Sequence, residues 1–214
     1  MDTGFWHLRW ERGEIGFHEN QVNPALIEHL GILDLAKGSR LFLPLCGKTL
    51  DIAWLLSQGY RIVGAELSSL AVNELFQSMD LTPDINPVGK LLCYSATNID
   101  IWVGDIFDVS SNMLGAVDAV YDRAALVALP EEMRQRYAFH LTALTHGAPQ
   151  LLISYEYDQR LYDGPPFSVR EKELKRYYGE NYLLKHMAQE KIAGGFKGKV
   201  EAAITTWLLW GGAP

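Results

Sequence analysis

The chain has 214 residues, of which 48% are hydrophobic and 21% are charged, and its formal net charge is −7. This length fits one α/β domain with a substantial core and is short for two. Phosphate binding needs concentrated positive charge, and Lys and Arg form no stripe along the sequence, so the composition argues against nucleic acid as a main partner.

The two cysteines, Cys46 and Cys93, cannot form a disulfide framework, and free thiols fit a reducing cytosol. The first residues lack the basic start and apolar core of a signal peptide. No apolar run approaches the roughly 20 residues that span a bilayer. We therefore expect a soluble, cytoplasmic protein that has no membrane partner.

The first half of the chain predicts a strand–turn–helix–strand unit. The initial 20 residues are rich in aromatic side chains and precede the first predicted helix, which Asn23-Pro24 caps. Residues 40–45 are apolar without alternation, as in a strand that is buried on both faces of a parallel sheet. Helices are predicted over residues 25–30, 49–57 and 68–79, and strands over 40–45 and 61–66.

The second half continues the alternation of strands and helices. Residues 81–90 hold two prolines and a glycine and predict a loop, and residues 95–98 predict the turn of a hairpin. Further strands are predicted over 116–121, 150–155, 182–191 and 202–210, and helices over 130–145 and 171–178. The pattern predicts a doubly wound, mostly parallel seven-stranded sheet with an antiparallel C-terminal hairpin, in a single domain over residues 1–214.

Polar or glycine-containing segments follow four of the predicted strands. Ligands of such sheets bind beyond the carboxyl ends of the strands, so these four ends are expected to converge on one crevice. They are Leu45-Cys46-Gly47, Glu66, Gly104-Asp105-Ile106 and Asp122-Arg123.

Glu66 is the strongest single candidate for ligand binding. A carboxylate at the tip of the second strand can accept two hydrogen bonds from vicinal ribose hydroxyls. The alternative is a solvated glutamate that precedes a helix cap. Gly47 lets the backbone approach a ligand closely, and the absence of G-x-G-x-x-G argues against a pyrophosphate in that ligand.

Asp105 and Arg123 each leave two interpretations open. Asp105 faces an exocyclic adenine amine or is an aspartate of a turn. Arg123 points into the crevice toward an electron-rich substrate, the interpretation we favour, or pairs with Asp122 or another acid. The N-terminal aromatic segment, with Trp10 and Phe17, could act as a lid, and a Trp face attracts a cation such as a sulfonium.

Four segments together carry a resemblance to a known family. They are Trp6-His7-Leu8-Arg9-Trp10 with Gly16-Phe17-His18, Leu43-Pro44-Leu45-Cys46-Gly47-Lys48, Val63-Gly64-Ala65-Glu66-Leu67-Ser68 and Tyr121-Asp122-Arg123-Ala124-Ala125-Leu126. With them the chain resembles bacterial-type thiopurine S-methyltransferase over essentially its whole length. Pro-Leu-Cys-Gly-Lys is unusual among methyltransferases and is the most specific of these motifs.

The resemblance implies a class I methyltransferase fold that uses S-adenosylmethionine. It implies cofactor contacts for Trp10, Leu45, Gly47, Glu66, Asp105, Ile106 and Arg123, and substrate contacts for Phe17, His18 and Arg123. It makes residues 1–20 an N-terminal lid. The family also brings a basic residue from the C-terminal part to the substrate, and here Lys197 or Lys199 is the candidate. No metal ligand and no catalytic base are assigned, and Arg123 is the candidate that orients a thiolate.

The predicted reaction is methyl transfer to the sulfur of a thiopurine or another aromatic or heterocyclic thiol, with selenium or tellurium compounds as further acceptors. Two alternatives remain open at this point: a non-catalytic S-adenosylmethionine-binding module and an NAD(P)-dependent oxidoreductase. The oxidoreductase would need the three-glycine turn that is absent. A monomer is expected, because no large apolar surface pattern is evident.

Overall fold

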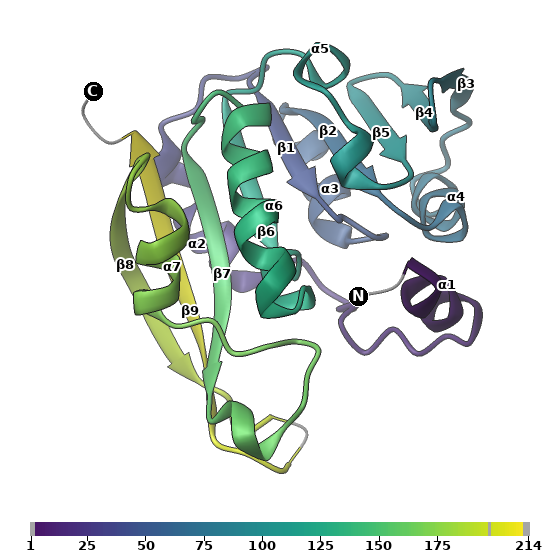
Figure 1. The fold of residues 1–214 in the computed structure, drawn as a ribbon. Helices are drawn as coiled ribbons and strands as arrows, with labels where there is room; N and C mark the ends of the chain where they lie inside the picture. Colours follow the sequence, from purple (N-terminus) through teal and green to yellow (C-terminus); the bar gives the residue numbers. More distant parts are fainter. Residues whose placement is uncertain (1–2, 197, 212–214) are drawn as a thin grey trace. The chain divides into compact units, whose positions relative to one another are not determined.

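The computed structural model describes residues 3–196 and 198–211. They form two compact units, the first extending to Ala119 and the second starting at Val120. Figure 1 follows the chain by colour, from purple at the N-terminus to yellow at the C-terminus. Each unit contains both strands and helices.

The first unit contains five strands and several short helices. Its strands are β1 (Arg40–Pro44), β2 (Arg61–Glu66), β3 (Asp84–Val88), β4 (Leu91–Ala96) and β5 (Ile99–Val103). Its α-helices are α1 (Thr3–Glu11), α2 (Pro24–His29), α3 (Leu50–Ser57), α4 (Ser69–Ser78) and α5 (Ser111–Leu114). Two 3-10 helices, η1 (Leu30–Leu33) and η2 (Ile106–Asp108), complete the unit.

The strands of this unit lie in the order β3-β4-β5-β2-β1. β1 pairs with β2 and β2 pairs with β5 in parallel, whereas β3, β4 and β5 form an antiparallel meander. β1 and β2 are buried except at their first residues. The uninterrupted apolar runs therefore predicted parallel strands correctly, because such strands are covered on both faces.

The predicted loop over residues 81–90 is wrong, because Asp84–Val88 forms β3. All but its last residue are exposed, so no buried apolar face marks this strand in the sequence. Pro87 is tolerated because β3 is an edge strand. With β3 included, the described residues form nine strands, whereas the predicted sheet has seven.

The N-terminal segment also differs from expectation, since Thr3–Glu11 forms the helix α1. Trp10 is its only buried residue, and its first turn carries no acidic side chain. The helix thus lacks both the apolar stripe and the charge pattern that identify a helix in a sequence.

Side-chain caps start α2 and α4, and the cap of α2 lies where the sequence indicated. The Asn23 side chain accepts a hydrogen bond from the Ala25 N–H, with 3.0 Å between the heavy atoms. Ser68 caps α4 in the same way through the Ala71 N–H, at 3.3 Å. Each cap satisfies one of the backbone donors that a helix N-terminus leaves unpaired.

The second unit carries the C-terminal strands. They are β6, which begins at the boundary (Ala119–Arg123), β7 (Gln150–Tyr157), β8 (Tyr182–Lys191) and β9 (Ala202–Gly211). β6 and β7 are parallel, and β9 pairs antiparallel with both β7 and β8. The antiparallel C-terminal hairpin is therefore confirmed.

The helices of the second unit are η3 (Leu126–Ala128), α6 (Glu131–Leu144), η4 (Gln159–Leu161) and α7 (Glu171–Tyr178). α6 and α7 lie on the viewer's side of its strands in Figure 1. A partly buried ion pair between Arg134 Nε and Glu173 Oε1, 2.7 Å apart, joins these two helices.

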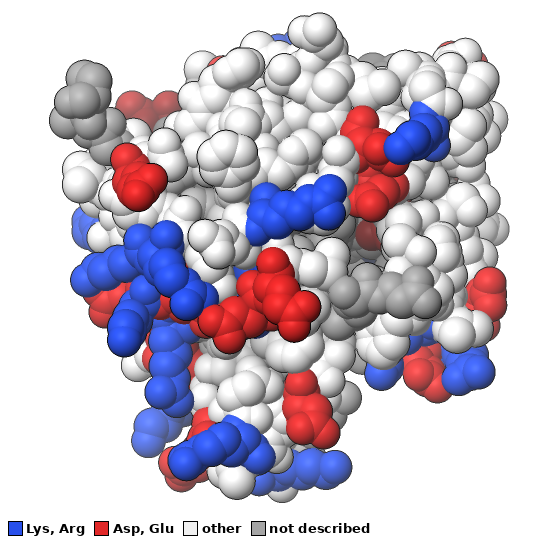
Figure 2. Space-filling view, in the orientation of Figure 1, with Lys and Arg blue, Asp and Glu red and all other residues white. Residues whose placement is uncertain are grey.

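Charged side chains of both signs are interspersed on the face that Figure 2 shows. The basic side chains gathered over α7 have acidic neighbours: Lys175 pairs with Glu171 at 2.6 Å and Arg176 with Glu131 at 2.7 Å. Lys175 and Arg176 are thus each paired with a carboxylate. Within the described part of the chain, no helix is both long enough and apolar enough to cross a bilayer.

Candidate cofactor and acceptor site

The turn after β1 brings backbone N–H groups to the end of β2. Leu45 and Gly47 both have positive φ angles, 47° and 55°. Such angles strain a residue with a Cβ, and strain of this kind is concentrated at functional turns. The Gly47 N–H donates to Glu66 Oε2 at 2.8 Å. The turn is thus fastened to the carboxylate that ends the second strand.

Glu66 is buried, with 6% of its surface exposed, so it is not a solvated glutamate. Its Oε1 accepts the Ser68 N–H at 2.8 Å, while Oε2 accepts that of Gly47. Burial raises the pKa of Glu66, and the N–H groups of Ser68, Gly47 and Leu67 oppose that rise. A carboxylate oxygen can accept a second hydrogen bond, so a fixed Glu66 retains capacity for ligand hydroxyls.

Trp10, in the last turn of α1, packs against this glycine turn. A Cβ on Gly47 would lie 3.1 Å from Cζ2 of the Trp10 ring, so a larger residue would displace the indole. Lys48 Nζ lies 5.9 Å from the centroid of the same ring and forms an ion pair with Glu74 at 2.6 Å. The indole already attracts one cation, as the face of a Trp ring does.

Phe17 extends this aromatic surface. Its ring meets Trp10 edge-on at 5.4 Å between centroids and Trp6 at 5.7 Å. His18 follows in the same turn, where its backbone N–H donates to the Ile15 carbonyl at 2.8 Å. The first unit therefore brings Trp10 and Phe17 together with Gly47 and Glu66, although about 60 residues of chain separate the ends of this group.

Asp105 is the N-cap of η2, and its side chain accepts the Phe107 N–H at 3.0 Å. This is the geometry of a turn aspartate, and contact with an adenine amine stays a prediction. Gly104 joins the ends of two strands, because its N–H donates to the Glu66 carbonyl at 2.9 Å. Ile106 is buried directly after Asp105.

Arg123 is the last residue of β6 and stands in register with Ile153 of β7. It is half-buried, whereas the preceding Asp122 is fully buried. Neighbouring strand residues point to opposite faces of a sheet, so the two side chains leave β6 in opposite directions. Arg123 belongs to the second unit, and the convergence of all four strand ends on one crevice stays a prediction.

The C-terminal basic candidates are only partly covered by the structure. Lys197 lies outside the described residues. Lys199 is exposed, and its backbone N–H donates to the Phe196 carbonyl at 3.0 Å. Its contact with substrate stays a prediction.

Cys46 is unsuited to nucleophilic chemistry, because burial and the nearby Glu66 charge raise its pKa well above the usual value. It is 8% exposed and fills the space beside Gly64, where an added Cβ would lie 2.9 Å from the sulfur. Cys46 is therefore a small packed residue of the core.

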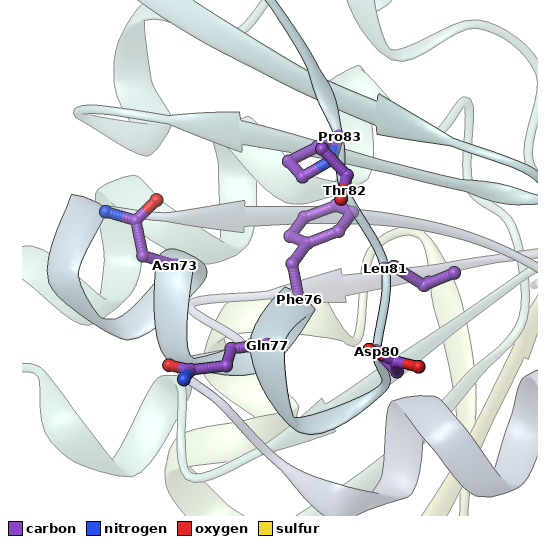
Figure 3. A pocket seen from close by; sticks show the side chains of 7 residues that line it. All are labelled: Asn73, Phe76, Gln77, Asp80, Leu81, Thr82 and Pro83. Atoms are coloured by element: carbon purple, nitrogen blue, oxygen red, sulfur yellow. The ribbon is translucent and has the colours of Figure 1, made fainter.

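A surface pocket of about 290 Å³ lies at the far end of α4 from Glu66. Figure 3 shows the Phe76 ring directed from the helix toward Thr82 and Pro83. The other residues that line the pocket are Asn73, Gln77, Asp80 and Leu81. Since α4 starts beside Glu66 and rises about 1.5 Å per residue, this pocket is separate from the Glu66 carboxylate.

Sequence reasoning missed two contacts that organise these segments. In the first, Lys48 forms an ion pair with Glu74 and lies over the Trp10 ring. The hydrogen bond from the Tyr137 hydroxyl to Asp122 was not foreseen either. Neither contact follows a short-range sequence pattern, so no local signal could have revealed it.

Comparison with known proteins identifies the family of this chain. A family model described as thiopurine S-methyltransferase matches residues 1–207. The chain belongs to the thiopurine S-methyltransferase family. The resemblance inferred from its motifs is confirmed, and S-adenosylmethionine is its cofactor.

Two relatives show how closely the chain follows this family. The thiopurine S-methyltransferase of Teredinibacter turnerae is 52% identical over 209 residues, which cover 98% of this chain and 97% of that protein. The protein of the same name from Xanthobacter autotrophicus is 51% identical over 210 residues, covering 98% and 99%. The match therefore extends over the whole family sequence.

Solved structures with little sequence similarity share the fold. An S-adenosylmethionine-dependent methyltransferase from Anabaena variabilis has a TM-score of 0.65 at 13% identity, over 97% of this chain and 94% of that one. The 1,6-didemethyltoxoflavin-N1-methyltransferase of Burkholderia thailandensis, solved with S-adenosylhomocysteine, has a TM-score of 0.65 at 16% identity, over 97% and 87%. The class I methyltransferase fold is confirmed, with two strands more than predicted.

The residues of the first unit fit this cofactor. Glu66 presents a fixed, buried carboxylate suited to a ribose diol. Gly47 is left without a side chain where the backbone turns beside Trp10. Membership of the thiopurine S-methyltransferase family also favours methyl transfer over the non-catalytic and oxidoreductase alternatives.

Proposed function

We propose that this enzyme methylates the sulfur of a thiopurine or another aromatic or heterocyclic thiol, and that it also accepts selenium or tellurium compounds. The carrying observation is that the Trp10–Phe17 ring pair packs against the turn fastened to Glu66. Aromatic surface beside the turn after β1 suits a flat acceptor, and this supports the proposal. The names of the two relatives support the same acceptor class.

On the cofactor side, Glu66 binds the ribose hydroxyls and the Leu45 backbone contacts the methionine part, which Trp10 covers. Asp105 and Ile106 flank the adenine. The 3-10 helix that Asp105 caps supports this role, since it holds both residues at the end of β5. Residues 1–20 form the lid of a single domain, and Phe17 and His18 line the acceptor pocket.

The bound cofactor supplies a methyl group that its sulfonium charge already activates. The protein mainly aligns the acceptor with that methyl group and excludes water. An aromatic thiol that is partly ionised near neutral pH needs no dedicated base. Arg123 orients the acceptor, and its positive charge favours the thiolate.

The same proposal covers partners and location. We infer a cytoplasmic monomer that acts on small molecules and does not bind nucleic acid. The free thiols of Cys46 and Cys93 support a reducing compartment. Size-exclusion chromatography with light scattering tests the oligomeric state, and a dimer would contradict this part of the proposal.

The function is tested by binding and turnover together. Calorimetry should detect S-adenosylmethionine binding and no NADH binding. Transfer of labelled methyl should follow to a thiopurine and to an aryl thiol, and then to selenium and tellurium compounds. Cofactor binding without transfer to any of these acceptors would favour a non-catalytic module instead.

A further inference from the structure

Asp122 is a buried carboxylate that the proposed reaction does not use. It is completely buried and directly precedes Arg123 at the end of β6. Its Oδ1 accepts the Leu126 N–H at 3.1 Å, and its Oδ2 accepts the Tyr137 hydroxyl at 2.7 Å. The Ala125 N–H also donates to it. The side chain therefore gathers three donors around the turn that follows β6.

That turn has an unfavourable backbone conformation. Ala124 has a φ angle of 60°, in the left-handed region that is unfavourable for a residue with a Cβ. Such a conformation persists only where its surroundings hold it. Asp122 supplies this hold by binding the two N–H groups that come immediately after Ala124.

Arg123 lies between two fixed points. Before it, the β6–β7 ladder aligns the backbone, with Arg123 itself opposite Ile153. After it, the Asp122 carboxylate fixes the turn. Farther along, the Phe167 N–H donates to the Val127 carbonyl at 2.7 Å and fastens the segment that follows. The direction in which the Arg123 side chain leaves β6 thus depends on this turn.

Tyr137 links the turn to the helix α6. It is completely buried, and burial together with the Asp122 charge raises its pKa well above 10. Tyr178 of α7 also faces the Asp122 charge, and its pKa is raised well above 10 for the same reasons. Both tyrosines therefore keep their protons at neutral pH, and Tyr137 acts as a donor.

We propose that Asp122, held by Tyr137, is a positioning residue that fixes the Ala124 turn and thereby aims Arg123 at the methyl acceptor. The inference rests on the acceptor role proposed for Arg123. A charged side chain costs more to bury than a neutral one, so a carboxylate at a fully buried position calls for a reason. An ionised carboxylate carries only hydrogen-bond acceptors, whereas a neutral amide also carries donors. It therefore suits a position where three donors converge.

The test compares Asp122→Asn and Tyr137→Phe with the matched control Tyr182→Phe. Tyr182 is a buried tyrosine of the same unit, and its hydroxyl donates to the Ala148 carbonyl at 3.2 Å, away from the Ala124 turn in the sequence. Kinetic constants are measured separately for acceptor and cofactor. Hydrogen exchange of the peptide containing residues 123–129 reports on the turn without any need for activity.

Asp122→Asn should lower kcat/KM for the acceptor by up to about 100-fold, because small misplacements of a positioning group have costs of that size. Tyr137→Phe should lower it by about tenfold, since a carboxylate that loses one donor keeps the other two. The KM for S-adenosylmethionine should stay within about twofold, and Tyr182→Phe should behave as the wild type. Exchange of the turn amides should accelerate in both test variants only.

A double-mutant cycle separates positioning from general structural damage. Adding Asp122→Asn to Arg123→Ala should cause little further loss, since no guanidinium remains to be aimed. Full additivity, unchanged exchange in Asp122→Asn, or equal losses for acceptor and cofactor would overturn the inference.

Failure of the proposed function would look different from failure of this inference. A wild type that methylates no thiol would remove the proposed function. Accelerated exchange in Asp122→Asn, with Tyr182→Phe unchanged, would still support the hold of Asp122 on the turn. Unchanged exchange would overturn that hold whatever the activity.

Discussion

Glu66 of the first unit and Asp122 of the second are both buried carboxylates at or near the carboxyl end of a parallel strand. Both accept backbone N–H groups from the turn that follows their strand, those of Ser68 and Leu126 respectively. Glu66 keeps 6% of its surface exposed, and the donors to it are backbone N–H groups. Asp122 is fully buried and also accepts a hydrogen bond from the Tyr137 hydroxyl.

The difference separates two uses of the same chemical group. A carboxylate with remaining exposure and free acceptor capacity can bind a ligand. A carboxylate enclosed by donors can only hold its surroundings in place. Four experiments test this distinction.

The pH dependence of stability should identify Asp122 as the enclosed carboxylate. Burial raises its pKa from 3.8 to about 6, so its favourable contribution is complete below about pH 4 and is lost as the pH rises through 6. The free energy of unfolding of the wild type, minus that of Asp122→Asn, should fall by about 3 kcal/mol between about pH 3 and pH 7. Urea denaturation at several pH values measures this difference, and a flat profile would contradict it.

Glu66→Ala should weaken S-adenosylmethionine binding by about 100-fold, because hydrogen bonds to a charged group contribute about 1.5–3 kcal/mol each. The Gly47 and Ser68 N–H groups would lose their acceptor as well. Calorimetry gives the dissociation constant, and Glu66→Gln serves as the control that retains one acceptor oxygen. Unchanged affinity in Glu66→Ala would remove Glu66 from the ribose site.

Arg123→Ala should lower kcat/KM for the thiol acceptor by about 30-fold while the fold and the cofactor affinity survive. The loss follows from removal of the positive charge that favours the thiolate. Steady-state kinetics with each substrate varied in turn measure it, and circular dichroism checks the fold. Wild-type kinetics in Arg123→Ala would show that the turn held by Asp122 does not position a residue that turnover needs.

Gly47→Ala should destabilise the protein by about 1 kcal/mol more than Gly13→Ala does. Both glycines have positive φ angles, 55° and 67°, so each substitution pays for backbone strain. Only at Gly47 does the new Cβ meet Trp10, at 3.1 Å, whereas nothing lies within 4 Å of the Cβ at Gly13. Thermal unfolding of the two variants isolates the Trp10 contact, and equal destabilisation would argue against it.

Local patterns predicted those elements whose signals are themselves local. The apolar runs of β1 and β2 and the cap at Asn23 depend on neighbouring residues, and all were predicted. β3 was missed because an exposed edge strand has no apolar face to reveal it. α1 was missed because only Trp10 is buried in it.

By itself, the sequence determined the strand–turn–Glu66 unit, the class I fold and the thiopurine S-methyltransferase family. Only the tertiary structure shows which groups donate hydrogen bonds to Glu66 and Asp122. The hydrogen bond between Gly47 and Glu66 joins residues 19 positions apart, and that between Asp122 and Tyr137 joins residues 15 apart. Both contacts exist because packed helices and strands bring distant segments together. A buried carboxylate whose hydrogen bonds are all formed is then held rigidly in place.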